Sequence, residues 1–136
     1  MRASFAVLPI LAALVAASPA PAPAPVAEGI KVANATLSQR DYTDARFTWY
    51  EVGQGACGGT NTDSEYVVAL NSDQYDGGAY CWELINISYN GQSTQAAIVD
   101  ECPGCPYGGL DLSPSLFSFL AGSTAPGVIY GEWSFA

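Results

Sequence analysis

The chain has 136 residues, of which 13 are Asp or Glu, four are Lys or Arg, four are Cys and none is His. No basic residue follows Arg46, so the last 90 residues (136 − 46) carry ten carboxylates without a single Lys or Arg. Binders of nucleic acid or anionic membrane need cationic side chains to neutralise phosphate, so we expect neither partner. The lack of His excludes Ser-His-Asp catalysis, Cys-His catalysis and His-ligated zinc. The length suits one domain.

Residues 1–17 have the pattern of a secretory signal peptide. Arg2 supplies the positive start, an apolar run extends from Phe5 to Val15, and Ala17 precedes the preferred cleavage site. A membrane anchor is the alternative, but roughly 11 apolar residues are too few for a bilayer, which needs about 20. The sequence therefore predicts an extracellular, secreted protein.

Residues 18–45 are predicted to lie outside the folded domain. Pro alternates with Ala up to Pro25, which is typical of an extended, polyproline-like spacer. We interpret the remainder as a flexible tail or pro-segment, and whether the mature protein retains it is left open. Sequons at Asn34 and Asn86 predict N-glycosylation, which fits secretion.

The four cysteines are Cys57, Cys81, Cys102 and Cys105. In a small secreted chain they predict two disulfides, worth about 2–4 kcal/mol each, and three pairings are possible. A redox role for the last two would need a surrounding strand–helix–strand unit, which the sequence lacks. The first two are not paired at metal-ligand spacing, so we expect neither a metal nor another cofactor.

From residue 46 onward the pattern is that of an all-β domain. A short aromatic strand is predicted at 47–52 and a second strand at 66–70, with a tight glycine-rich loop at 53–59 between them. Asn71 then follows as the cap of a short helical turn.

Alternation of apolar and polar residues predicts a half-buried strand at 83–89, which leaves Asn86 exposed. Asn90-Gly91 is a strong signal for a type I′ hairpin turn, with a return strand at 92–100.

The last elements are a helix and a strand. Ser113 as N-cap and Pro114 at the first helical position predict a helix through Ala121, and 127–135 alternates as a strand. Short strands with one or two small helices favour a compact barrel over a helix bundle.

Five segments form a recognisable series when taken in order: Phe47-Thr48-Trp49-Tyr50, Gly55-Ala56-Cys57-Gly58, Tyr66-Val67-Val68-Ala69-Leu70, Val99-Asp100-Glu101-Cys102-Pro103-Gly104-Cys105 and Leu110-Asp111-Leu112-Ser113-Pro114. The series resembles the expansin, barwin and rare-lipoprotein-A-like group, and within it the small single-domain fungal members such as the loosenins. The resemblance covers residues 46–136. It implies a six-stranded double-psi β-barrel with one or two short helices, stapled by disulfides.

The resemblance also implies a groove and its residues. The Asp on which activity depends in the family falls on Asp111, and a second groove carboxylate falls on Asp100. The first-strand groove positions fall on Thr48 and Tyr50.

Disulfides Cys57–Cys81 and Cys102–Cys105 are likewise implied by the resemblance. One departure from the family pattern is Trp82, which stands where Gly is common. The chain ends just after the last predicted strand, so we expect no second, carbohydrate-binding domain.

Aromatic rings stack on the apolar faces of sugars, and the polar tips of Tyr and Trp can hydrogen-bond hydroxyl groups. On this ground we add Trp82 and Tyr107 to Thr48 and Tyr50 as substrate-binding candidates.

Glycan cleavage needs an acid and, with inversion, a base some 6.5–9.5 Å away. Asp111 is the natural acid, and we expect repulsion from Asp100 to raise its pKa, with no salt bridge inside the barrel to oppose this. Glu51 stands where related barrel endoglucanases have the base, but strand alternation directs it away from the face of Tyr50. The base is therefore unassigned, and the sequence favours a protein that is not an enzyme.

The leading hypothesis is a secreted, monomeric, expansin-like protein that binds and loosens neutral cell-wall polysaccharide without hydrolysis. The first alternative is an inhibitor of secreted cysteine proteases, with the loops around Cys57 and Cys102–Cys105 as its contact surface. Weak glycan hydrolysis or lysis with Asp111 as acid is the third.

Overall fold

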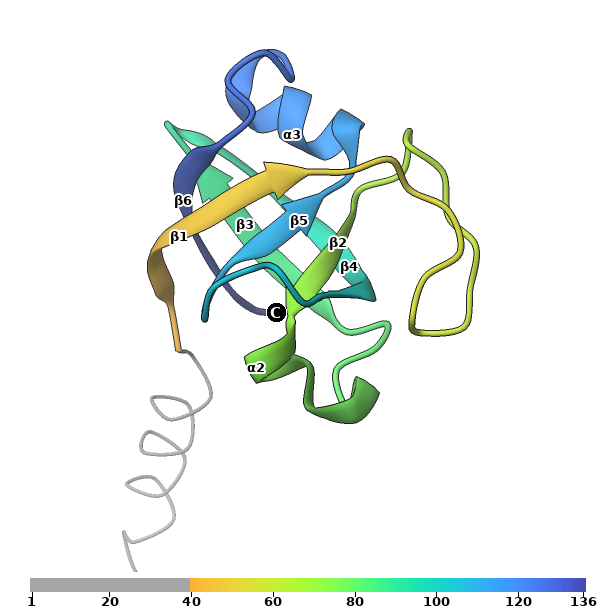
Figure 1. Cartoon of the computed structure of the whole chain (residues 1–136). Coiled ribbons are helices and arrows are strands. Elements are labelled where there is room, and N and C mark those ends of the chain that lie inside the picture. The colour runs from red at the N-terminus through yellow and green to blue at the C-terminus, as the bar shows by residue number, and fades with distance from the viewer. Residues whose placement is uncertain (1–39) are drawn as a thin grey trace, which may run out of the picture.

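The computed structural model describes residues 40–136, which form a closed barrel (Figure 1). The predicted signal peptide, most of the predicted spacer and Asn34 lie outside these residues. The elements in chain order are β1 (Tyr42–Trp49), β2 (Val67–Asn71), α2 (Ser72–Tyr75), the 3-10 turn η1 (Asp76–Gly78), β3 (Leu84–Tyr89), β4 (Gln92–Cys102), β5 (Leu110–Leu112), α3 (Pro114–Ala121) and β6 (Ile129–Phe135).

The six strands close in the order β1-β5-β2-β4-β3-β6. The pairs β1–β5 and β2–β4 are parallel and the other four pairs are antiparallel. The predicted six-stranded barrel is therefore confirmed. The hairpin prediction is also confirmed, because Asn90 and Gly91 have φ of 47° and 82°, as a type I′ turn requires.

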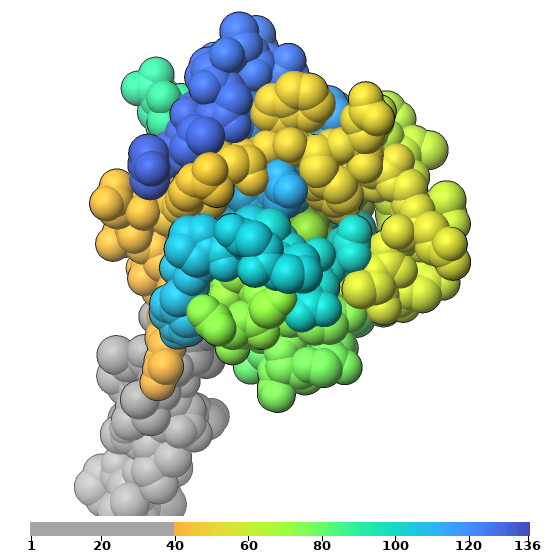
Figure 2. Space-filling view, viewed as in Figure 1, coloured from red at the N-terminus to blue at the C-terminus, as the bar shows by residue number. Residues whose placement is uncertain are grey.

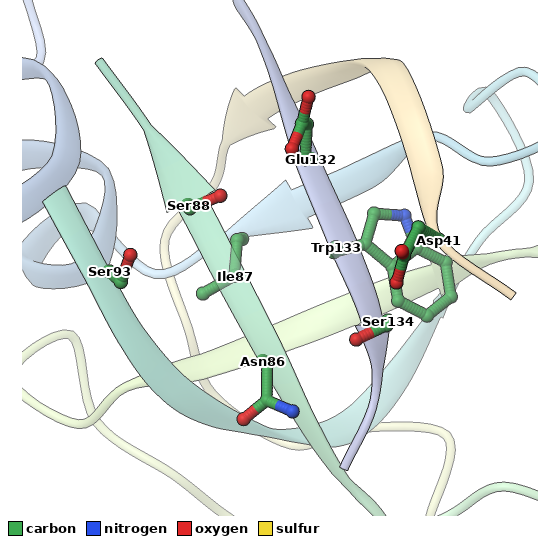
Figure 3. Close-up of a pocket in the computed structure, with 8 residues that line it drawn as sticks. All are labelled: Asp41, Asn86, Ile87, Ser88, Ser93, Glu132, Trp133 and Ser134. Atoms are coloured by element: carbon green, nitrogen blue, oxygen red, sulfur yellow. The ribbon is translucent and has the colours of Figure 1, made fainter. Parts of the chain in front are cut away.

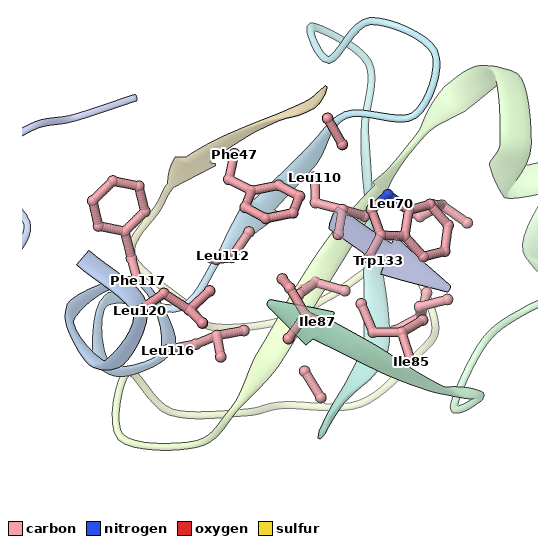
Figure 4. Packing of buried hydrophobic residues seen from close by; sticks show 14 of the residues in the cluster. Phe47, Leu70, Ile85, Ile87, Leu110, Leu112, Leu116, Phe117, Leu120 and Trp133 are labelled. Carbon is pink, nitrogen blue, oxygen red and sulfur yellow. The ribbon is translucent and has the colours of Figure 1, made fainter. Parts of the chain in front are cut away.

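The core fills the barrel and continues under α3, which closes one end (Figures 1 and 4). Alternation places every second strand residue inside, as in β5, where the two leucines are fully buried and the aspartate between them is not. The largest buried side chains are Trp133, Phe47, Phe117, Leu70, Ile85, Ile87, Ile98, Leu110, Leu112 and Leu116.

Local capping follows the predicted signals. Asn71 accepts a hydrogen bond from the Gln74 N–H at the start of α2, and Ser113 accepts one from the Leu116 N–H at the start of α3. These side chains satisfy backbone N–H groups that a helix start leaves without partners. Figure 1 places α2 and α3 at opposite ends of the barrel.

Two disulfides join Cys57 to Cys81 and Cys102 to Cys105, the pairing that the resemblance implied. The first ties the glycine-rich loop to the segment before β3. The second closes a tight turn after β4.

The barrel starts earlier than the predicted domain boundary at 46. β1 begins at Tyr42, and Tyr42 and Ala45 pair with β6 across a local register shift. The sequence did not predict a strand at these residues, because a bulge interrupts the alternation of apolar and polar side chains there. No helix within residues 40–136 is long and apolar enough to cross a membrane.

Candidate functional site

A row of outward-facing residues crosses four neighbouring strands. The strand register pairs Thr48 in β1 with Asp111 in β5, Asp111 with Ala69 in β2, and Ala69 with Asp100 in β4. Paired residues on neighbouring strands point to the same face, so Thr48, Asp111 and Asp100 share one surface. The barrel thus brings together three of the predicted groove residues from strands far apart in sequence.

Asp100 reaches this face because β4 carries a bulge. Val68 pairs with Ile98 but the next residue, Ala69, pairs with Asp100, so Val99 has no partner in β2. One extra residue reverses the alternation beyond it, and the side chain of Asp100 turns outward. Without the bulge, Asp100 would point into the apolar barrel.

The small side chain of Ala69 separates the two carboxylates. Neighbouring strands lie about 4.8 Å apart, so the backbones of Asp100 and Asp111 are separated by about 9.6 Å. Because Ala69 has only a methyl side chain, the surface between the two carboxylates is recessed. Figure 2 shows β5 at the bottom of a depression, with β1 and the loop after it on one side and the segment after β4 on the other. We call this depression the groove.

Asp111 is half-buried and accepts a hydrogen bond of 2.7 Å from the Thr48 hydroxyl. Its pKa is raised above the ordinary value, chiefly because burial disfavours the charged form. The Thr48 hydrogen bond and the positive charge of Arg46 act in the opposite direction, and Asp100 adds a smaller upward effect. The predicted direction is therefore correct, but burial rather than repulsion from Asp100 is the main cause.

Tyr50 stands next to the same carboxylates. Its backbone N–H donates to the Leu112 carbonyl at 3.0 Å, which continues the β1–β5 pairing beyond the end of β1. Burial, followed by the charges of Asp100, Asp111 and Asp63, raises the pKa of its hydroxyl. Tyr50 therefore keeps its proton and offers a hydrogen-bond donor to a ligand in the groove.

Asp100 also holds the neighbouring loop. Its Oδ1 accepts hydrogen bonds from the Ala56 and Glu101 N–H groups, both at 2.8 Å. The Val99 carbonyl, freed at the bulge, accepts from the Cys57 N–H at 3.2 Å. Gly55 allows this approach, since a Cβ there would lie 2.3 Å from that carbonyl oxygen. Asp100 is thus part of the support of the loop as well as of the groove.

Sequence reasoning missed Asp63. Its Oδ1 accepts from the Val52 N–H at 2.6 Å, and its charge acts on Tyr50, so it adds a third carboxylate near the groove. Nothing in its local pattern distinguishes it from an ordinary loop residue. Glu51, the position considered for a base, is exposed and follows the end of β1.

The two aromatic candidates lie elsewhere. Trp82 is 52% exposed and packs over Gly59, at the edge of the loop that Asp100 supports. Tyr107 packs edge-on against Tyr42, with ring centroids 6.1 Å apart, and lines a separate hollow together with Asp73 and Gln74 of α2. The structure therefore does not bring Tyr107 into the row of Thr48, Asp111 and Asp100.

The sequon residue Asn86 is in β3, on the side of the barrel opposite the groove. Its side chain is exposed, and its Oδ1 accepts a hydrogen bond of 2.9 Å from Gln95. It lines a polar hollow of about 220 Å³ between β3 and β6 (Figure 3). Glycosylation there stays a prediction.

The described residues contain no group of three or more Cys, Asp or Glu side chains arranged to hold a metal ion. The groove offers the carboxyl groups of Asp63, Asp100 and Asp111 together with the hydroxyl groups of Thr48 and Tyr50. Such a set can bind sugar hydroxyl groups and can supply an acid proton from Asp111.

No family model matches the sequence. Among curated relatives, the Allergen Asp f 7 homolog of Arthroderma benhamiae is 32% identical over 106 residues, covering 65% of this chain and 37% of the relative. Expansin-like protein 2 of Dictyostelium discoideum is 35% identical over 107 residues, covering 70% of this chain and 26% of the relative. The chain thus spans only about a third of the length of these relatives or less.

Two solved structures have the same fold. A mutant Clavibacter michiganensis expansin in complex with cellohexaose is 27% identical, with a TM-score of 0.65, covering 71% of this chain and 50% of that one. The Streptomyces papain inhibitor is 29% identical, with a TM-score of 0.63, covering 71% of this chain and 94% of that one.

Fold and site together define a small, disulfide-stapled double-psi β-barrel with an acidic, open groove. The resemblance to the expansin-like double-psi β-barrels that the sequence indicated is therefore confirmed.

Proposed function

We propose that this protein is secreted and binds neutral cell-wall polysaccharide in the groove, loosening the wall without cleaving the chain. The observation that supports this proposal is the row of Thr48, Asp111 and Asp100 across four strands, with the Tyr50 hydroxyl beside it. Carboxylates, hydroxyls and one aromatic ring are the groups that recognise sugar hydroxyls and pyranose faces. An expansin of the same fold is found in complex with cellohexaose, which supports this ligand class.

The charge of the groove favours neutral ligands. Asp63, Asp100 and Asp111 gather around Tyr50, and their summed charge repels an anionic glycan such as pectin. Arg46 is the cation that acts on Asp111, and it offsets only part of this charge.

Binding is better supported than hydrolysis. Asp111 can supply a proton, but Oδ1 of Asp100 accepts two backbone hydrogen bonds and the chain has no His, so no residue is assigned as the base.

The test compares wild-type protein with Asp111→Asn in a wall-extension assay and in pull-downs on cellulose and chitin at two salt concentrations. Glu132→Gln is the matched control, since Glu132 is an exposed β6 residue outside the groove. We expect Asp111→Asn to lose extension while the control keeps it. Equal extension by all three proteins contradicts the proposal, and release of reducing sugar by wild type alone would favour hydrolysis instead.

Inhibition of a secreted cysteine protease is the second candidate. The chain covers 94% of the length of the Streptomyces papain inhibitor, which has the same fold, and this similarity supports the candidate. The loops tied by the Cys57–Cys81 and Cys102–Cys105 disulfides would form the contact surface. Titration of papain with wild type and Asp111→Asn decides between the two candidates, because inhibition through the loops does not depend on Asp111.

A further inference from the structure

A separate hollow lies at the α2 end of the barrel, away from the groove and from the hollow beside Asn86. Its volume is about 280 Å³, and none of Thr48, Tyr50, Asp100 or Asp111 lines it. Its lining comes from segments that are far apart in sequence: Arg40, Tyr42, Asp73, Gln74, Asp76, Tyr80, Tyr107 and Phe135. We call it the α2 hollow.

Five aromatic rings form a continuous series of contacts along the α2 hollow. Tyr107 meets Tyr42 edge-on at 6.1 Å, and Tyr42 stacks on Trp133 at 4.3 Å. Trp133 meets Phe135 at 5.2 Å, and Phe135 packs against Tyr80 at 4.7 Å. The two terminal rings, Tyr107 and Tyr80, are 61% and 37% exposed, so the series ends in open ring surface on both sides.

The centre of this series is rigidly held. Trp133 is 2% exposed, and its indole N–H donates to the Gly108 carbonyl at 2.8 Å. A buried indole ring whose N–H is hydrogen-bonded is fixed in one orientation, so Tyr42 and Phe135 pack against a rigid ring.

A buried amide faces the hollow with a defined orientation. Gln74 is 8% exposed, and its Oε1 accepts from the Asn71 Nδ2 at 2.8 Å and from the Gly108 N–H at 3.0 Å. Both bonds are made by Oε1, which leaves Nε2 as the donor of this amide. Burial and the neighbouring Tyr107 raise the pKa of the Tyr42 hydroxyl, and the Gln74 amide acts in the opposite direction, as a donor close to that hydroxyl does. The hollow therefore has a fixed N–H donor beside two tyrosine hydroxyls.

We propose that the α2 hollow is a second saccharide site, which binds one pyranose unit of a neutral β-linked glucan or chitin chain. Exposed rings at Tyr80 and Tyr107 suit the apolar face of a sugar, and the Gln74 amide and the tyrosine hydroxyls suit its hydroxyl groups. The carboxylates of Asp73 and Asp76 at the rim suit sugar hydroxyl groups as hydrogen-bond acceptors. The lining has these two acidic residues and one cation, Arg40, so its net charge favours a neutral sugar over an anionic one.

The size of the hollow agrees with a single unit. Pockets for drug-sized ligands measure about 300–1,000 Å³, so about 280 Å³ holds one ring of a chain rather than a whole oligomer.

The proposal does not depend on the groove. With a second site, one barrel can bind two glycan chains of the same insoluble polymer at once. The second contact is then intramolecular and increases the overall affinity for the polymer.

The test is a titration of ¹⁵N-labelled protein with cellohexaose, chitohexaose and xylohexaose, followed by NMR. We expect the Gln74 side-chain amide and the backbone signals of Tyr80 and Tyr107 to shift with cellohexaose or chitohexaose. Tyr107→Ala should weaken binding at this site about two- to twelvefold, the effect of one aromatic contact, and Tyr107→Phe should weaken it less.

Tyr130→Ala is the matched control, because Tyr130 is a tyrosine of similar exposure on β6, outside the α2 hollow. Asp111→Asn separates this proposal from the groove, since it should leave the shifts at Gln74 unchanged. Shifts confined to the groove, no shift with any of the three oligosaccharides, or equal losses in Tyr107→Ala and Tyr130→Ala would overturn the proposal.

Discussion

Replacing Thr48 by Val tests whether the Thr48–Asp111 hydrogen bond holds a charged carboxylate in the groove. Val has nearly the same shape and suits a strand, so the change removes little besides the hydroxyl donor at 2.7 Å. A hydrogen bond to a charged group contributes about 1.5–3 kcal/mol, and a bond between neutral groups about 0.5–1.5 kcal/mol. Because Asp111 is only half-buried, the lower end of each range applies.

We therefore expect Thr48→Val to lower the free energy of unfolding by about 1.5 kcal/mol at pH 7 and by about 0.5 kcal/mol at pH 3. At pH 3, below the ordinary Asp pKa of about 3.9, Asp111 is protonated in both states, so the charge-assisted part of the bond is gone. The pKa of Asp111 should rise further in the variant, because the hydroxyl that favours its charged form is lost.

Urea unfolding with the disulfides intact measures this difference, and an m-value of about 1–3 kcal/mol/M converts 1.5 kcal/mol into a midpoint shift of about 0.5–1.5 M. Thr94→Val is the matched control, a partly exposed β4 threonine whose hydroxyl makes no hydrogen bond within residues 40–136. Equal losses at pH 7 and pH 3, together with an unchanged NMR titration of Asp111, would refute the reasoning.

Three further outcomes are expected. Asp111→Asn should gain stability relative to wild type between pH 3 and pH 7: a raised folded pKa means that wild type loses stability as pH rises from about 3.9 through that pKa, and Asn does not titrate. Urea midpoints at both pH values check this, and a constant difference contradicts it. Replacing Cys57 and Cys81 by Ala should lower the free energy of unfolding by about 3.5 kcal/mol, because their disulfide closes a loop with a sequence separation of 24. Thermal unfolding of the double variant measures this loss, and an unchanged midpoint temperature refutes it. Gly131→Ala should destabilise the barrel by about 1–3 kcal/mol, because its Cβ would lie 2.5 Å from a ring carbon of Phe47; wild-type stability of this variant would show that β6 can move to accept it.

Much of the fold could be predicted from local chemistry. Asn90-Gly91 defined the hairpin because both residues accept positive φ, and Ser113 marked the start of α3 because its hydroxyl can accept a backbone N–H. The alternation in β3 and β6 identified their buried faces, since side chains of a strand alternate with a period of two. The groove positions came from the family resemblance and not from such patterns.

Other features depend on contacts that no local pattern contains. β5 has only three residues, Leu110–Leu112, too few to show a period, and it becomes a strand because β1 and β2 pair with it on both sides. Asp63 joins the groove through a loop whose path the sequence does not reveal. Tyr107, an aromatic residue in a plausible loop, faces Tyr42 at the α2 end rather than the carboxylates.

The sequence by itself determined the residue types available for chemistry: carboxylates and tyrosines, without His and with no cation beyond Arg46. Only the tertiary structure decided what raises the pKa of Asp111. The bulge at Val99 turns Asp100 outward, pairing in β5 places Asp111 between two buried leucines, and partial burial raises the pKa of Asp111. The physical reason is that desolvation depends on what surrounds a group in space, and strands distant in the chain supply those surroundings.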